Sequence, residues 1–177
     1  MPLTITPLPF GLRDVKLYAL DAAEAPGTAV DLPAARTFTF QESEDFEELR
    51  GDDALKATHG NGPILNWSLE AGGISLEAAK VLMGGLITES GTTPNQLKTL
   101  AKLGTDSRPY FQVKGQIISD SGGDVHAVVY KCKAEGDVGG DFAEGSFFLT
   151  GASGRGLPKA DNKLWDIIQH ETAIAIS

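Results

Sequence analysis

The sequence predicts a mainly β protein, a β-sandwich or open barrel with one short flanking α-helix at about 76–83. Three observations lead to this fold class. Apolar and polar residues alternate in several short segments, which is the period of a half-buried strand. Clusters of glycine and proline, which are typical of turns, separate these segments. Only one stretch changes to helical spacing, and it is roughly two turns long.

Length and composition favour a single domain over residues 1–177. Of the 177 residues, 41% are hydrophobic and 22% are charged, which is sufficient for one globular core. The 24 acidic residues exceed the 15 basic ones, and the net charge of −9 disfavours tight binding to nucleic acid or anionic lipid. Neither a membrane span nor a signal peptide is expected, so the chain is predicted to be cytoplasmic at synthesis. Cys132 is the single cysteine, which excludes an internal disulfide.

The first quarter of the chain is predicted to hold an extended arm and two strands. Residues 1–13 are rich in proline and are expected to form an extended N-terminal arm. A strand is predicted at Val15–Leu20, followed by a loop at 22–33, where prolines and a glycine interrupt the pattern. The next strand, Arg36–Gln41, places its two phenylalanines on the inner face.

The segment 42–53 is predicted to be an acidic, solvated loop or a hairpin extension. It contains seven acids against Arg50 alone, and such a run is usually exposed and mobile. Two apolar residues within it, Phe46 and Leu49, indicate that it docks against a neighbour. Its acids are Glu42, Glu44, Asp45, Glu47, Glu48, Asp52 and Asp53.

The best-specified part of the chain is a strand followed by the helix. Leu65–Ala71 alternates strictly, and Gly72 and Gly73 end the strand. Ser75 is placed to cap the helix at 76–83, and Gly84 lies where a left-handed residue would end it. The helix is apolar over more than the usual stripe, so it lies either deep in its own core or partly against another subunit. Its candidate subunit contacts are Leu76, Val81, Leu82 and Met83.

The second half is predicted to contain further strands joined by loops. Residues 95–103 fit both helical spacing and an edge strand, and the pattern leaves this choice open. Phe111 to Ile117 and Val125 to Lys133 are predicted as two arms of a hairpin around a turn at 120–124. The remaining elements are a loop at 91–94, a loop at 135–144, a strand at 146–150, a loop at 151–156 and a closing strand at 164–176.

No set of residues predicts an enzyme, a cofactor or a metal site. Asp120 to Gly123 is similar to the segment around the nucleophile of trypsin-like proteases, but it is equally an ordinary hairpin turn. The glycine-rich run 151–156 fits neither phosphate-binding fingerprint. His59, His126 and His170 are far apart without ligand spacing, so each is interpreted as an isolated strand or loop residue.

Five segments carry a resemblance to a known family. They are Phe10–Leu17, the Phe38–Phe40 strand running into 49–53, Asn66–Ala78, Arg108–Phe111 and the apolar final strand. On these segments, which span nearly the whole chain, the sequence resembles the major tail tube proteins of long-tailed (siphovirus) bacteriophages, particularly those of actinobacterial hosts. The resemblance depends on the order of the elements more than on any single motif.

The resemblance implies a tail-tube-like β-sandwich with one flanking helix, which assembles with itself into six-membered rings. The rings stack into a hollow tube that conducts DNA during ejection without binding it specifically. In such a tube the acidic segment 42–53 would line the channel or lie between stacked rings. Tape-measure, tail-tip and tail-terminator proteins are the implied partners, and the virion tail is the implied location. The family has no catalytic residues, and it implies strand or loop at 95–103.

Two other classes of protein share the predicted fold. A β-sandwich binding module for carbohydrate or a receptor would expose a cluster of aromatic side chains. Aromatic residues make up only 7% of the chain, and Trp67, Phe38, Phe40 and Phe111 are in phase with strand interiors. A tail-terminator or head–tail connector protein would differ from a tube protein in forming isolated rings.

Overall fold

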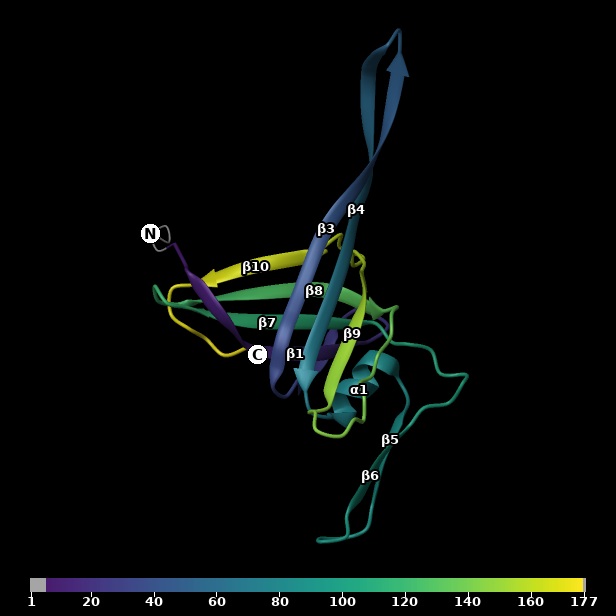
Figure 1. Ribbon diagram of the computed structural model, residues 1–177, viewed down its shortest axis with the longest axis vertical. Helices are drawn as coiled ribbons and strands as arrows, with labels where there is room; N and C mark the ends of the chain where they lie inside the picture. The colour runs from purple at the N-terminus through teal and green to yellow at the C-terminus, as the bar shows by residue number, and fades with distance from the viewer. Residues whose placement is uncertain (1–5, 177) are drawn as a thin grey trace.

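A computed structural model of the protein describes residues 6–176 and confirms the predicted β-sandwich with one short helix (Figure 1). The main sheet has eight strands, seven of them in the order β2-β1-β7-β8-β9-β4-β3, and β10 also pairs with β8. All pairings are antiparallel. Its strands are β1 (Pro9–Leu20), β2 (Pro26–Asp31), β3 (Ala35–Gly51), β4 (Ala54–Gly72), β7 (Phe111–Ser119), β8 (Asp124–Ala134), β9 (Leu149–Gly156) and β10 (Trp165–His170).

The sheet forms two layers because β8 changes partner along its length. Its first half pairs with β10, whereas Cys132–Ala134 pairs with β9. β9 then follows β4 over its full length, from Leu65 to Gly72 of that strand. Strands β2, β1, β7, β8 and β10 therefore form one layer, and β9, β4 and β3 form the other, which crosses the first steeply in Figure 1.

The core lies between these two layers. Trp67 of β4 packs edge-on against Phe111 of β7, with ring centroids 5.3 Å apart. The predicted alternation of β4 is confirmed, because its inward residues from Leu65 to Ala71 are all buried. Gly115 of β7 allows the layers to approach closely, since a Cβ there would lie 2.6 Å from the ring of Phe38.

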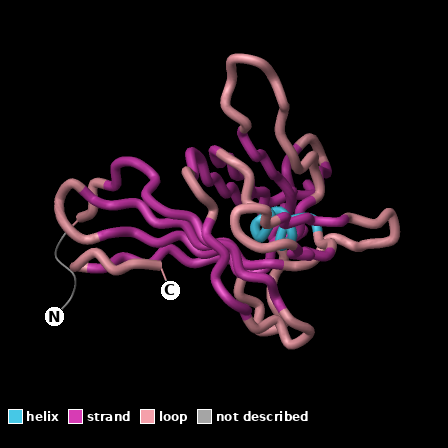
Figure 2. The backbone as a smooth tube through the Cα atoms, turned by 90° about the horizontal axis from the view of Figure 1, so that it is seen from below, coloured by secondary structure: helices cyan, strands magenta, loops and turns pink. Residues whose placement is uncertain are grey.

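Helix α1 (Leu76–Met83) has the predicted bounds and covers one end of the sandwich. Ser75 Oγ accepts a hydrogen bond from the Ala78 N–H at 3.2 Å, which satisfies one free donor of the first turn. Gly84 ends the helix as predicted and has a positive φ of 80°, although its ψ of −168° differs from that of a left-handed helical residue. In Figure 2, which looks along the long axis, loops surround the helix while the strands of the first layer run away from it.

Three residues of the helix are buried within the chain itself. Ala78, Val81 and Leu82 face the core. Val81 and Leu82 therefore offer no surface to a neighbouring subunit, which corrects their assignment as candidate contacts. Leu76 and Met83 are half-buried and remain candidates.

Two hairpins project from opposite ends of the molecule (Figure 1). One is the outer part of the β3–β4 hairpin, and the other pairs β5 (Leu86–Ser90) with β6 (Leu97–Ala101). The segment 95–103 is thus a strand at its centre and not a helix. β5 was not predicted from the sequence.

Other predicted boundaries are wrong for identifiable reasons. The predicted loop at 22–33 contains β2, because Pro26 and Gly27 begin that strand where it leaves the turn after β1. The predicted closing strand at 164–176 ends at His170. β1 begins at Pro9, so the last residues of the predicted arm at 1–13 are paired, and residues 1–5 lie outside the described part.

The glycine-rich run 151–156 is a strand rather than the predicted loop, and the predicted strand at 146–150 begins only at Leu149. β9 lies between β4 and the end of β8, and there is no room for a side chain at Gly154 or Gly156. A Cβ on Gly154 would lie 2.0 Å from the carbonyl oxygen of Lys133, and one on Gly156 would lie 2.4 Å from Leu65 Cδ2. Glycine is therefore required here by close approach rather than by a turn.

Candidate functional site

The first candidate site is the β3–β4 arm, defined here as residues 42–63, which extends beyond the sandwich (Figure 1). Its two strands pair with each other from Glu44↔Pro63 to Gly51↔Ala54. Side chains from Glu42 to Arg50 and from 52 to 59 are all exposed. The acidic run is therefore part of a paired hairpin rather than an unpaired loop.

Three apolar side chains on this arm are exposed to solvent. Phe46 is 62% exposed, Leu49 is 64% exposed and Leu55 is 51% exposed. Phe46 lies opposite Gly60, and its ring stands 3.2 Å from where a Cβ on that glycine would be. Leu55 was not identified from the sequence, because it lies just outside the acidic run. Phe46 and Leu49 are three residues apart on one regularly paired strand, so they lie on opposite faces of the hairpin, and a second protein could cover either face.

The seven acids of the arm differ in their contacts. Glu42 accepts a hydrogen bond from the Trp165 indole N–H, which ties the base of the arm to β10. Glu48 pairs with Arg50 at 2.7 Å, and Asp52 lies 3.6 Å from Lys56 Nζ. Glu44 accepts a hydrogen bond from the Gly62 N–H.

The opposite end of the molecule also exposes apolar side chains. Leu86 and Leu97 on the β5–β6 hairpin and Leu103 after it are exposed. Lys98 pairs with both Glu77 of the helix and Glu89 of β5, which joins the hairpin to the body. The two ends therefore differ in charge, since the acids are concentrated on the β3–β4 arm.

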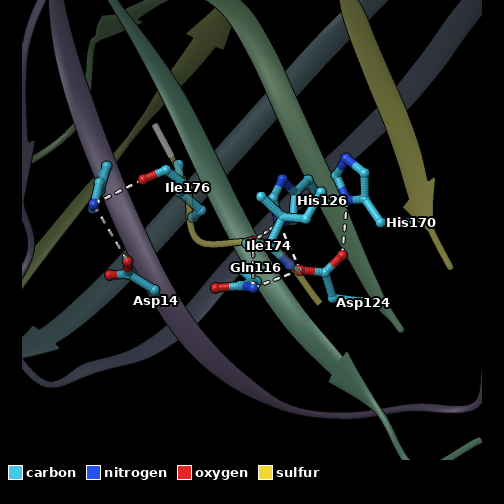
Figure 3. Close-up of polar contacts among 8 residues, drawn as sticks. Asp14, Gln116, Asp124, His126, His170, Ile174 and Ile176 are labelled. Carbon is cyan, nitrogen blue, oxygen red and sulfur yellow. Dashed lines mark hydrogen bonds and ion pairs between the residues drawn. The ribbon is translucent and has the colours of Figure 1, made fainter. Parts of the chain in front are cut away.

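The second candidate site is a cluster of Asp124, His126 and His170 (Figure 3). Asp124 and His126 are two residues apart on β8, so their side chains leave the same face of the sheet. His170 is paired directly opposite Asp124 on β10. His170 Nδ1 lies 2.7 Å from Asp124 Oδ1, and His126 Nε2 lies 3.0 Å from Asp124 Oδ2.

Two further donors complete the surroundings of the Asp124 carboxylate. Gln116 Nε2 of β7 donates to Oδ2 at 2.6 Å, and the backbone N–H of Ile174 donates to the same oxygen at 2.9 Å. Asp124 is fully buried, and burial alone would raise the pKa of its carboxyl. The hydrogen bonds from Ile174, Gln116 and the two histidines outweigh burial and lower that pKa to about 2. The carboxylate is therefore ionised at neutral pH.

The chain after β10 is held over this cluster. The carbonyl oxygen of Ile174 lies 3.0 Å from His126 Nε2, and that of Ile176 accepts from Lys16 Nζ at 2.9 Å (Figure 3). Ile176 is buried. The last described residues thus close over the outer face of the first layer and do not extend β10.

The interpretation of each histidine as an isolated residue is wrong for His126 and His170, whose rings are 4.5 Å apart between centroids. The spacing of Asp124 and His126 was visible in the sequence. Their proximity to His170 was not visible, because it depends on the pairing and register of β8 with β10. His59 lies exposed on the β3–β4 arm, far along the chain from this cluster.

Ser121 lies in the turn between β7 and β8, as predicted. Its hydroxyl donates to the carbonyl oxygen of Thr6 at 3.0 Å and lies 2.9 Å from Ser119 Oγ. Neither partner is a base that could take a proton from Ser121. The similarity to a protease nucleophile is therefore explained by the turn.

No model of a known protein family matches the chain, and no curated protein matches it. Between residues 6 and 176, no helix has the length and apolar character needed to span a membrane.

Proposed function

We propose that this protein is a structural subunit that assembles with itself into stacked rings, forming the tail tube of a long-tailed bacteriophage. The tube would conduct DNA, and the subunit has no catalytic role. Six subunits per ring, the virion tail as location, assembly in the host cytoplasm, and tape-measure, tail-tip and tail-terminator partners belong to the same proposal.

One observation supports the proposal most strongly: the β3–β4 arm exposes Phe46, Leu49 and Leu55 beyond the body of the subunit. A hairpin of two strands is marginally stable alone in water. Covering one such side chain contributes on the order of 1.5–3 kcal/mol. A neighbouring subunit that covers the arm would therefore stabilise both the arm and the assembly.

The positions of the two hairpins suit repeated association. The β3–β4 arm and the β5–β6 hairpin project from opposite ends, and both expose apolar residues (Figure 1). Contacts between two different surfaces are heterologous, and they generate rings or open stacks rather than closed pairs. Residues Leu76 and Met83, half-buried beside the second hairpin, are further candidates for such a contact.

The charge of the chain suits a conduit for DNA. Duplex DNA carries one negative charge per ~1.7 Å of axis, so a basic wall would hold it through many phosphate contacts. The chain carries a net charge of −9, and seven acids are on the arm. An acidic surface would let DNA pass without binding, whether these acids face the channel or lie between rings.

Electron microscopy of the purified protein tests the proposal. Tubes support it, isolated rings favour a tail-terminator or connector protein, and monomers at all concentrations contradict self-assembly. Replacing both Phe46 and Leu49 by serine should raise the concentration needed for assembly about 100-fold, since two buried side chains are lost. Thr58→Ala, an exposed change on the same arm, is the matched control and should assemble normally.

A binding module remains the second candidate, because the β8–β9 loop exposes two aromatic side chains. Phe142 is 87% exposed and Phe147 is 92% exposed. Such residues are typical of recognition surfaces as well as of subunit contacts. If the protein stays monomeric, and replacing both with alanine abolishes binding to the host surface, this second function replaces the first.

A further inference from the structure

The cluster on β8 and β10 has the composition of a metal site as well as that of a hydrogen-bond network. Asp124, His126 and His170 each offer one ligand atom, and these atoms lie within 4.8 Å of one another. They come from two adjacent strands rather than from a loop, so the sheet fixes their positions. We propose that these three side chains bind one divalent transition-metal ion of the zinc class.

The spacing of the ligand atoms is close to what such an ion requires. Zinc binds imidazole nitrogen and carboxylate oxygen at about 2.0–2.2 Å, so neighbouring ligand atoms in a tetrahedral site lie about 3.3 Å apart. The carboxylate oxygens of Asp124 lie 2.7 Å from His170 Nδ1 and 3.0 Å from His126 Nε2. To admit the ion these two distances would each lengthen by about half an ångström, and the third separation, which is within 4.8 Å, would have to approach the same tetrahedral value.

A fourth ligand is present in the backbone. The carbonyl oxygen of Ile174 lies 3.0 Å from His126 Nε2, on the chain that closes over the cluster. The Ile174 N–H and the Gln116 side chain both donate to Asp124 Oδ2. They would remain as outer partners that orient the carboxylate, a role that such partners have in known metal sites.

The ligand types decide the class of ion. Two imidazoles with one carboxylate suit zinc, and also cobalt, nickel, copper or iron, whereas calcium and magnesium prefer oxygen ligands alone. The ion takes the positions of the two N–H protons that now face the carboxylate. Each neutral ring keeps its proton but carries it on the nitrogen that does not bind the ion, so no proton is gained or lost by the ring.

An ion can reach the cluster from the surface. His126, His170 and Ile174 line an open pocket whose wall also includes Lys114 and Lys159. Both ammonium groups lie over aromatic rings, at 4.9 Å from the Tyr18 centroid and 5.9 Å from the Tyr130 centroid. The aromatic faces partly offset their charge. Asp124 does not itself line the pocket, but its buried carboxylate is in hydrogen-bond contact with His126 and His170, which do.

Metal binding would join three parts of the chain at one point. The side chains hold β8 to β10, and the Ile174 carbonyl holds the chain end to both. Because the ion binds the folded chain and not the unfolded one, it would raise the unfolding temperature. This inference does not depend on the proposed assembly, since its readouts are obtained on dissociated subunits.

The test is a titration of the chelator-treated protein with Co²⁺ and Zn²⁺. Cobalt should give saturable visible absorption at one ion per chain, and zinc should displace it. His170→Gln should weaken binding by at least about 100-fold, the upper end of the loss seen for outer partners alone. His59→Gln, on the exposed arm, is the matched control and should bind as the original chain does.

Nitrogen–proton correlation spectra of the histidine rings show, without any substitution, which histidines bind the ion. Zinc should shift the ring signals of His126 and His170 and leave those of His59 unchanged. Absence of saturable absorption at millimolar cobalt, or equal shifts of all three rings, would overturn the proposal. The cluster would then act as a hydrogen-bonded anchor for the chain end only.

Discussion

Strand β4 passes through two regions that both pair with β3 but differ in burial and in their second neighbour. In the β3–β4 arm, Ala54 to His59 are all exposed, whereas farther along the strand alternate residues from Leu65 to Ala71 are buried. The arm has one neighbour for each strand, while the inner part of β4 lies between β3 and β9. A continuous strand therefore combines a hairpin held by backbone pairing with a core held by packing.

Because of this difference, the stability of the folded chain and its association with other chains should depend on different regions of the molecule. Burial of apolar area is the main favourable term in folding, and in this molecule it is concentrated in the body. The arm contributes little burial within the subunit but exposes Phe46, Leu49 and Leu55. Changes in the body should therefore lower stability, and changes in the arm should alter assembly.

Hydrogen exchange should give the largest contrast between the two regions. Amides of β7 and β8 open only with global unfolding, whereas a two-stranded hairpin opens locally at little cost. We expect arm amides at 44–60 to exchange at least about 1000-fold faster than those of β7 in free subunits, a difference of ~4 kcal/mol. In assembled tubes their protection should rise. Equal, strong protection of both regions in free subunits would mean that the arm needs no partner.

Replacing a leucine by alanine should lower the unfolding free energy much more in the body than in the arm. Leu82 is fully buried against the core, so Leu82→Ala should lower the free energy of unfolding by about 2–5 kcal/mol. Leu49→Ala removes the same atoms from the exposed arm and should change that free energy by less than about 0.5 kcal/mol. Denaturant unfolding of dissociated subunits measures both. Similar losses in the two variants would contradict the division between body and arm.

The same contrast explains how much of the fold was predictable. The bounds of helix α1 and the end of β4 were predicted, because each has a local pattern: a capping serine before an apolar run, or strict alternation ended by glycines. The start of β4 at Ala54 was not predicted. The acidic run left loop and hairpin open, since its charge indicates exposure but not pairing. The exposed residues Phe46 and Leu49 were identified, but Val81 and Leu82 were assigned to a contact although they face the core.

Features that depend on distant neighbours were not predictable. β9 was interpreted as a loop because its glycines resemble a turn, although they are required by contact with Lys133 and Leu65. The cluster at Asp124 needs the register of β8 with β10, which no local pattern contains. Sequence periodicity specifies which face of a strand is buried, and it does not specify which strand lies beside it.

Removing polar contacts should give a smaller difference in unfolding free energy between the body and the arm. Tyr130 donates a hydrogen bond to Asp166, joining β8 to β10 in the body, and Tyr130→Phe should cost about 1 kcal/mol. Glu48 and Arg50 form an exposed pair on the arm, and Arg50→Ala should change stability by only a few tenths of a kcal/mol. Unfolding of both variants measures the difference, and a larger loss for Arg50→Ala would contradict it.

The hydrogen bond to Asp166, together with burial, raises the pKa of Tyr130 from 10.0 to about 12. The folded chain therefore holds this proton more tightly than the unfolded chain. The resulting stabilisation is fully present below pH 10 and is lost as the pH rises towards 12. Ultraviolet titration should show a late tyrosine that is absent from Tyr130→Phe.

The smallest effects on the subunit itself should come from the acids of the arm. Glu44, Asp45, Glu47 and Glu48 are exposed, so replacing all four by their amides should change the unfolding free energy by no more than about 1 kcal/mol. Their effect on assembly should be larger, because identical arms bring like charges together. Neutralisation should therefore lower the concentration at which free subunits polymerise.

Salt provides the control for this last effect. The Debye length falls from about 10 Å at 0.1 M to about 3 Å at 1 M, so added salt should promote assembly of the original chain and have little effect on the neutralised variant. Light scattering across a salt series measures both. If salt promotes the two equally, hydrophobic contacts alone set the threshold, as at Phe46 and Leu49. If neutralisation instead prevents assembly, the acids bind a positive surface of the next subunit, and repulsion between arms is not what keeps the free subunit soluble.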